Sequence, residues 1–149
     1  MTYPEKRIID FIGEHHILTI AVAKDNIPWC ASCYYAFMKE ENQFVITSDH
    51  ETRHIKEVVE GENYKVAGTI ALETRIVGKI RGIQFSGMLK PLSGDELKKA
   101  KSAYLKRFPI ARLMPDLHLW IIDPMFIKMT DNRLGFGKKL TWHAKESQE

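Results

Sequence analysis

The chain has 149 residues, of which 44% are hydrophobic, 28% charged and 10% aromatic, and its formal net charge is +3. This composition predicts a single globular domain over residues 1–149. The mild charge gives no argument for nucleic acid, and no apolar run approaches the ~20 residues that a membrane span needs. The charged start MTYPEKRIID and the two cysteines, too few for a disulfide framework, predict a cytoplasmic protein.

The first third of the chain predicts one helix and then an antiparallel meander. Thr2 and Glu5 have capping-box spacing, so a helix is expected to begin there and to end at Gly13. Apolar, β-branched runs then predict strands at 17–23, at about 29–38 and at 44–47. Asp25-Asn26 and the polar stretch 39–42 are the turns between them.

The rest of the chain predicts more strands and two further helices. Caps at 48–52 open a helix that Gly61 ends, and the capping box Ser93–Glu96 opens one that Pro109 ends. Strands are expected at 64–72, at 80–89 and at 117–129, followed by a polar, basic tail from Thr130. About six meandering strands with three short helices favour a closed or half-closed antiparallel β-barrel of the mainly β (α+β) class over a doubly wound fold.

The turn after the third strand has the features of an anion site. Thr47 and Ser48 end the strand, and a helix N-terminus follows with its unpaired amides and positive dipole end. Thr52 adds a hydroxyl, and Arg53 and His54 add positive charge, so these groups together predict phosphate binding. The alternative is that Thr52 only caps the helix and Arg53 is solvated.

The same segment also spells a zincin motif. His50 and His54 are one helical turn apart and Glu51 stands between them, as in zinc hydrolases. However, His50 falls before the expected helix, and no third ligand follows at the spacing of metzincins. Zinc hydrolysis through His50 and His54 is therefore a remote alternative.

Four other segments carry residues that suggest a ligand site or chemistry. The strand at 80–89 turns Gly82, Gln84 and Ser86 to one side, a face that suits a flat polar ligand or an outer face in water. Cys30 and Cys33 form a CxxC, but their thiols would point to opposite faces of a strand, so small buried cysteines are expected. The basic residues around 135–137 could close over a ligand, whereas the lysines of 98–107 are expected to be solvated.

Five segments, in this order, resemble the pyridoxamine-phosphate-oxidase-like FMN-binding split barrels, and within them a small bacterial branch of unassigned function. They are ILTIAVAKDNIPWCASCYYAF, FVITSDHETRHIKEV, KVAGTI, IRGIQFSG and DNRLGFGKK. The resemblance implies a split barrel that forms a homodimer with two FMN sites at the subunit interface. It places the phosphate and the flavin ring on residues of both chains: Thr47, Ser48, Thr52, Arg53 and His54 for the phosphate, Ala31, Ser32, Cys33 and Tyr34 along the ring, Gly82 or Gln84 from the neighbouring strand, and Lys138 from the partner.

The chain also departs from the family pattern. Where the family usually has serine, then arginine or lysine, then lysine, this chain has Thr52, Arg53 and His54, so a fixed charge becomes a titratable one. The Arg-Leu-Ala-Pro ending and the substrate-phosphate arginines of the oxidase are missing, so the authentic oxidase reaction is not expected.

The resemblance therefore leads us to expect a flavin-dependent oxidoreductase for an unidentified small molecule or nicotinamide, with no nucleic-acid or membrane partner. A carrier or sensor of flavin or haem without turnover is the alternative, with His15, His16, His54 or His143 as a haem ligand. A deazaflavin in place of FMN also fits the sequence.

Overall fold

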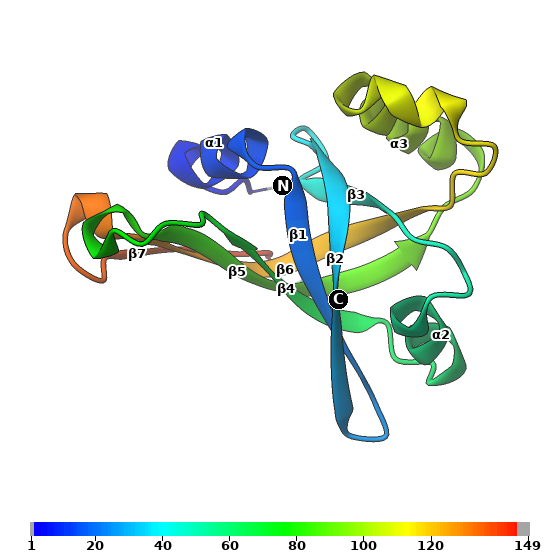
Figure 1. Cartoon of the computed structure of the whole chain (residues 1–149), viewed down its shortest axis with the longest axis horizontal. Helices are drawn as coiled ribbons and strands as arrows, with labels where there is room; N and C mark the ends of the chain where they lie inside the picture. Colours follow the sequence, from blue (N-terminus) through cyan, green and yellow to red (C-terminus); the bar gives the residue numbers. More distant parts are fainter. Residues whose placement is uncertain (1, 146–149) are drawn as a thin grey trace.

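A computed structural model describes residues 2–145 and shows one antiparallel sheet with helices around it (Figure 1). The sheet has seven strands in the order β3-β2-β1-β4-β5-β6-β7. The elements are α1 (Lys6–Glu14), β1 (Ile17–Lys24), β2 (Ile27–Met38), β3 (Gln43–Thr47), α2 (Arg53–Glu60), β4 (Lys65–Ala71), η1 (Val77–Lys79), β5 (Arg81–Pro91), α3 (Gly94–Arg107), η2 (Pro109–Leu113), β6 (Leu119–Asp131), η3 (Asn132–Leu134) and β7 (Lys139–His143).

A second pairing closes part of the sheet into a barrel. The start of β6 pairs with β3, from Thr47 opposite Leu119 to Phe44 opposite Ile122, while later residues of β6 pair with β7. The β5–β6 register shifts at Ser86 and Gly87, beside Pro124, where the sequence predicts a bend. The result is the predicted split barrel, closed at one end and open at the other.

Two apolar clusters hold the layers together. The larger fills the barrel interior and includes Tyr35 of β2 and Phe44 of β3. The smaller lies on the other side of the same strands, where Ala36 and Val45 pack beneath Tyr104 of α3. Successive strand residues point to opposite faces, so β2 contributes side chains to both clusters. Because one of its faces is buried under α3, this packing holds α3 against the barrel.

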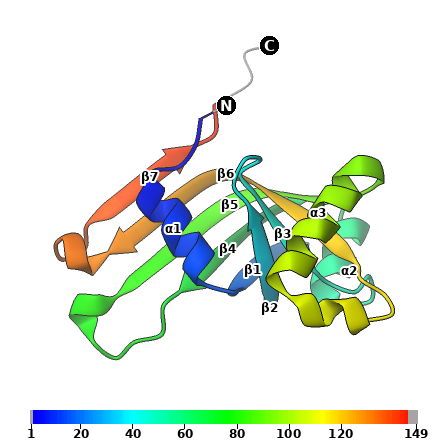
Figure 2. The ribbon, with the colours of Figure 1, turned by 90° about the horizontal axis from the view of Figure 1, so that it is seen from above.

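Helix α1 lies over one face of the sheet, with Ile8, Phe11 and Ile12 buried (Figure 2). Its C-terminal carbonyls are capped from α3, since Arg107 donates to the oxygens of Gly13 (2.9 Å) and His15 (2.6 Å).

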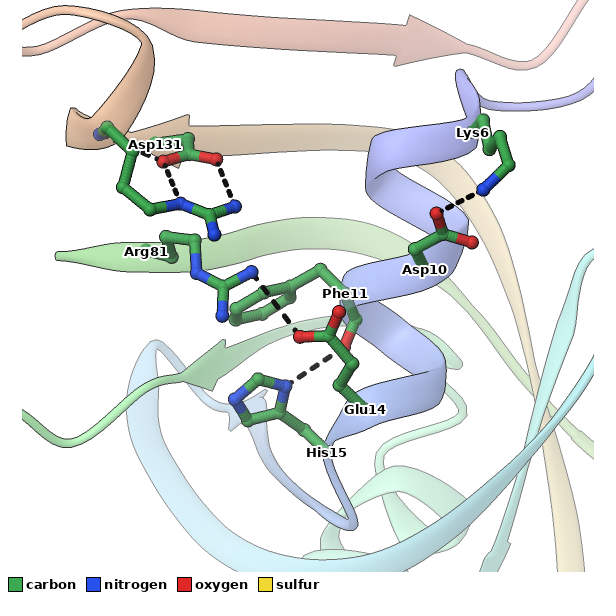
Figure 3. A network of polar contacts seen from close by, with 8 residues as sticks. Lys6, Asp10, Phe11, Glu14, His15, Arg81 and Asp131 are labelled. Atoms are coloured by element: carbon green, nitrogen blue, oxygen red, sulfur yellow. Dashed lines mark hydrogen bonds and ion pairs between the residues drawn. The ribbon is translucent and has the colours of Figure 1, made fainter. Parts of the chain in front are cut away.

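A group of ion pairs joins α1 to the open end of the sheet (Figure 3). Arg81 pairs with Glu14 at 3.3 Å and lies over the ring of Phe11. Nearby, the buried carboxylate of Asp131 accepts hydrogen bonds from the backbone and side chain of Arg133.

Most predicted elements are confirmed, including the Asp25-Asn26 turn, where both residues have positive φ (51° and 65°). The predicted capping boxes are wrong in detail. Helix α1 begins at Lys6, after an extended segment that Tyr3 anchors by donating to the Glu40 carbonyl, and α3 begins as expected but Ser93 makes no side-chain cap bond.

The polar, basic tail from Thr130 is not predicted to contain a strand, but residues of it form β7. Leu140 and Trp142 alternate with polar residues there and pack against the main core. This alternation is the sequence signal for a strand, but it extends over only a few residues. No helix among residues 2–145 is long and apolar enough to cross a membrane.

Candidate functional site

The turn between β3 and α2, residues 48–52, together with the first turn of α2, is called the anion corner below. Thr52 is the N-cap residue of α2 but its side chain makes no cap bond, because its hydroxyl donates to the Asp49 carbonyl at 2.7 Å. The first-turn amides of a helix have no acceptor within the helix. Without a side-chain cap, those of α2 are left for an external acceptor such as a phosphate.

A buried polar cluster lies behind this turn. The Ser48 hydroxyl is 2.8 Å from Nε2 of His54 and 3.5 Å from the Cys33 sulfur. The Ser48 backbone is also fixed, since its carbonyl accepts from Trp120 Nε1 at 3.0 Å and its amide donates to His118 at the same distance. Ser48 is therefore held by three other segments of the chain.

His54 does not provide the exposed positive charge expected from the sequence. Its side chain is 7% exposed, and burial lowers its pKa, so it is neutral at pH 7 in the free chain. Its contact with Ser48 fixes the turn from inside.

Arg53 is the exposed cation of the anion corner. Its Nε donates to Glu57 at 2.7 Å, and its guanidinium lies 3.9 Å from the ring centroid of Trp29. These two contacts fix the orientation of the guanidinium, which belongs to the first residue of α2. Trp29, on β2, was not recognised as a site residue in the sequence, because its contact with Arg53 is made only in the folded chain.

The zincin arrangement is not formed. His50 lies before α2, with its ring against His118 (4.6 Å between centroids) and Trp120 (5.3 Å), whereas His54 is bonded to Ser48. Within residues 2–145 no group of three or more His, Cys, Asp or Glu side chains is placed to hold a metal ion. The geometry therefore gives no support to zinc hydrolysis.

The open face of the sheet carries a row of polar side chains. Cross-strand pairing aligns residues of six strands: Ser32, Thr19, Thr69, Gln84, Lys128 and Thr141. Ser32 and Tyr34 are exposed on β2, whereas Cys33 is buried and Ala31 packs against the core, so the last two would offer only backbone to a ring on this face. Cys30 is exposed, contrary to the prediction that both cysteines are buried.

Gly82 and Gln84 lie on the open face of β5. A Cβ added at Gly82 would be 3.4 Å from the Ile70 carbonyl oxygen, an ordinary contact, so packing within this chain does not require the glycine. Strands β1 and β4 separate β5 from β2, which places Gln84 roughly 14 Å from Ser32, three interstrand spacings away.

Aromatic residues of α3 border this region. Tyr104 is 3.1 Å from the Thr47 hydroxyl, and Phe108 meets Tyr34 edge-to-face at 5.5 Å. Thr47 is thus partnered by α3. The sequence predicts the helix, but its contact with Thr47 depends on the fold.

The remaining predicted residues are dispersed. Lys138 belongs to the loop between η3 and β7. This loop lies at the opposite end of the sheet from α2 (Figure 2). Among the haem-ligand candidates, His15 Nδ1 is 2.9 Å from the Phe11 carbonyl oxygen, while His16 and His143 are exposed. A groove of about 760 Å³ between α1 and α3 is separate from the anion corner.

Solved structures define the class of fold. A haem-binding protein from Mycobacterium smegmatis is similar at a TM-score of 0.78 with 14% identity; the match covers 96% of this chain and spans 60% of the other. A pyridoxamine 5'-phosphate oxidase-related, FMN-binding protein from Nostoc punctiforme matches at 0.63 with 13% identity, over 90% of this chain and 83% of that one. The haem storage protein HutZ from Vibrio cholerae matches at 0.64 with 17% identity, over 83% and 91%. The chain has the split-barrel fold that these flavin- and haem-binding proteins share, as its sequence predicts.

Sequence relatives identify the family. The chain is 41% identical over 139 residues to a UPF0306 protein of Klebsiella pneumoniae, covering 93% of this chain and 92% of that protein. It is 42% identical over 139 residues to a UPF0306 protein of Yersinia pseudotuberculosis, covering 91% and 90%. No family model matches the chain. The protein belongs to the UPF0306 family.

Proposed function

We propose that this protein binds FMN at a site shared between two copies and acts as a cytoplasmic flavin-dependent oxidoreductase on a small molecule or nicotinamide. The observation that carries the proposal is the anion corner, where the N-terminus of α2 has no side-chain cap and its first residue, Arg53, carries a guanidinium oriented by Trp29 and Glu57. Backbone amides and a guanidinium are the groups that proteins use to hold a phosphate. FMN-binding and FAD-binding proteins among the structures of similar fold support a flavin as its carrier.

The open sheet face supports placement of the flavin ring. Ser32 and Tyr34 lie on β2 within reach of a ligand anchored after β3, and Phe108 borders them. The flavin would supply hydride or electron transfer, while the chain holds its phosphate and leaves one face of the ring open to a substrate.

The distances favour a site completed by a second copy. Gln84 is roughly 14 Å from Ser32 on the same chain. Lys138 belongs to the loop between η3 and β7, and this loop lies at the far end of the sheet from α2 (Figure 2). In the proposed dimer, Lys138 reaches the flavin held by the other subunit, and Gln84 or Gly82 faces that ring.

Exposed apolar side chains also support a dimer. Ile110 and Leu113 of η2 are 74% and 79% exposed, and Ile17, Tyr34 and Met114 are exposed as well. We propose that a second copy covers these side chains, because burial of apolar surface favours association.

Mixed dimers test the shared site. Arg53→Ala and Lys138→Ala are each expected to weaken FMN binding. In a dimer with one copy of each variant, one site regains both an intact Arg53 and an intact Lys138, and the other site has neither. Flavin fluorescence titration of purified mixed dimers should show one restored site per dimer. No restoration would contradict a shared site, and a wild-type protein that binds no flavin would contradict the whole proposal.

Haem carriage without turnover is the second candidate, and the haem-binding protein from Mycobacterium smegmatis and HutZ favour it through their fold. His16 and His143 are exposed and could act as ligands. The visible spectrum of the purified protein separates the candidates, because haem gives a Soret band and flavin does not. Loss of a Soret band in His16→Ala or His143→Ala would identify the ligand.

A further inference from the structure

The segment 49–57 carries more fixed negative than positive charge. Its ionised side chains are three acids and two bases: Asp49, Glu51, Glu57, Arg53 and Lys56. Both bases are already paired, Arg53 with Glu57 at 2.7 Å and Lys56 with Glu51 at 2.8 Å. A phosphate dianion bound there would meet the helix amides and Arg53, but the segment as a whole would repel it.

His54 is the group that can change this balance from within the site. It lies in the first turn of α2, is 93% buried, and places Nε2 2.8 Å from the Ser48 hydroxyl. In the free chain burial keeps it neutral, and no neighbouring charge contributes to the lowered pKa. An anion on the amides of the same turn would favour the imidazolium, because opposite charges close together stabilise one another.

We propose that His54 takes up a proton from solvent when a phosphate group binds at the N-terminus of α2. This inference rests on the proposed function, and it assigns the pH dependence of FMN binding to one residue. The protonated Nε2 donates to the Ser48 oxygen, so the Ser48 hydroxyl hydrogen is free for another acceptor. The segment then gains the one positive charge that it lacks.

Titratable groups from four other segments lie around His54 and the rest of α2. From β2, Cys33 is a neutral thiol, because burial raises its pKa. From α3, burial also raises the pKa of Tyr104. Lys24 of β1 is paired with Glu60 at 3.1 Å, at the other end of α2. His118, before β6, contacts His50 and reaches Ser48 only through its backbone.

Calorimetric titration of the protein with FMN tests the coupling. At pH 8 the phosphate of FMN is already a dianion, since the second pKa of a phosphate monoester is about 6. Titration in two buffers of different ionisation enthalpy gives the protons taken up per site. We expect uptake by the wild type and by His118→Gln, the matched control outside the anion corner, and none by His54→Gln. As the pH increases, the Kd of the wild type for FMN should rise by up to about tenfold per pH unit. The Kd of His54→Gln should not change with pH.

The possible results are distinct. FMN binding without proton uptake, or equal uptake by the wild type and His54→Gln, overturns this inference and leaves the proposed function intact. A wild type that binds no FMN overturns both. If His54→Gln does not fold, an NMR titration of the wild-type His54 ring decides, because its pKa must rise on binding FMN. Riboflavin, which lacks the phosphate, should leave that pKa unchanged.

Discussion

The guanidinium of Arg53 lies 3.9 Å from the ring centroid of Trp29, and this contact joins helix α2 to strand β2 at the anion corner. Trp29 is still 42% exposed, so the pair forms part of the surface that a ligand would meet. The contact, together with the bond from Arg53 to Glu57, limits the freedom of a long side chain. A cation oriented in this way loses less entropy when it binds a phosphate.

Replacing Arg53 by alanine should weaken FMN binding roughly 10- to 100-fold, because a hydrogen bond to a charged group contributes about 1.5–3 kcal/mol. The fold should survive, since the Arg53 side chain is about half exposed. Fluorescence titration measures the affinity, and circular dichroism checks the fold. Lys56→Ala removes the same charge from the same helix and should change the Kd less than twofold. An Arg53→Ala protein that kept its FMN affinity within twofold would rule out this phosphate site.

Asp131 should stabilise the fold in a way that depends on pH. The side-chain hydrogen bond from Arg133 is the largest cause that lowers its carboxyl pKa below the ordinary value. The stabilisation is therefore complete above the unfolded-state pKa of about 3.9 and is lost as the pH falls through the lower, folded-state pKa. Asp131→Asn should cost about 1–3 kcal/mol at pH 7, because it leaves buried groups poorly partnered.

Urea unfolding at pH 7 and at pH 3 measures this effect. The difference between wild type and Asp131→Asn should shrink at pH 3. Asp10→Asn is the control (Figure 3), because its pair with Lys6 is exposed and contributes little at either pH. An equal loss for Asp131→Asn at both pH values would contradict the assignment.

Two glycines of β5 should respond differently to alanine. A Cβ at Gly87 would lie 2.4 Å from the Asp123 carbonyl oxygen, so Gly87→Ala must displace backbone and should destabilise the fold by about 1–3 kcal/mol. A Cβ at Gly82 makes only an ordinary contact, and Gly82→Ala should cost less than about 1 kcal/mol. Thermal unfolding compares the two. Similar losses would show that Gly82 also serves packing.

The two cysteines should react at different rates. Cys30 is exposed, whereas Cys33 is buried beside Ser48 and burial raises its pKa. Because the thiolate is the reactive form, iodoacetamide at pH 8 should modify Cys30 first and reach Cys33 only when urea unfolds the chain. Mass spectrometry of timed samples follows both. Fast modification of both thiols in the folded protein would contradict the buried Ser48–Cys33 contact.

The sequence by itself determined an antiparallel barrel, most strand positions and the helix that follows the third strand, and the family resemblance supplied the split-barrel class. The first three features depend on local signals, namely alternation along a strand, turn residues such as Asp25-Asn26, and helix caps directly after a strand. Such signals act between near neighbours, so they can be read along the chain. They failed where the local pattern was weak, as for β7, or where a distant contact competed, as at Tyr3 and Glu40.

Only the tertiary structure decided what the side chains of the anion corner do. The sequence presents His54 as a cation, but burial against Ser48 makes it neutral, and Trp29 orients Arg53 from another strand. The burial of a group, and hence its charge, depends on all the segments that pack around it. Those segments come together only when the barrel closes, so local sequence patterns do not predict the contacts between them.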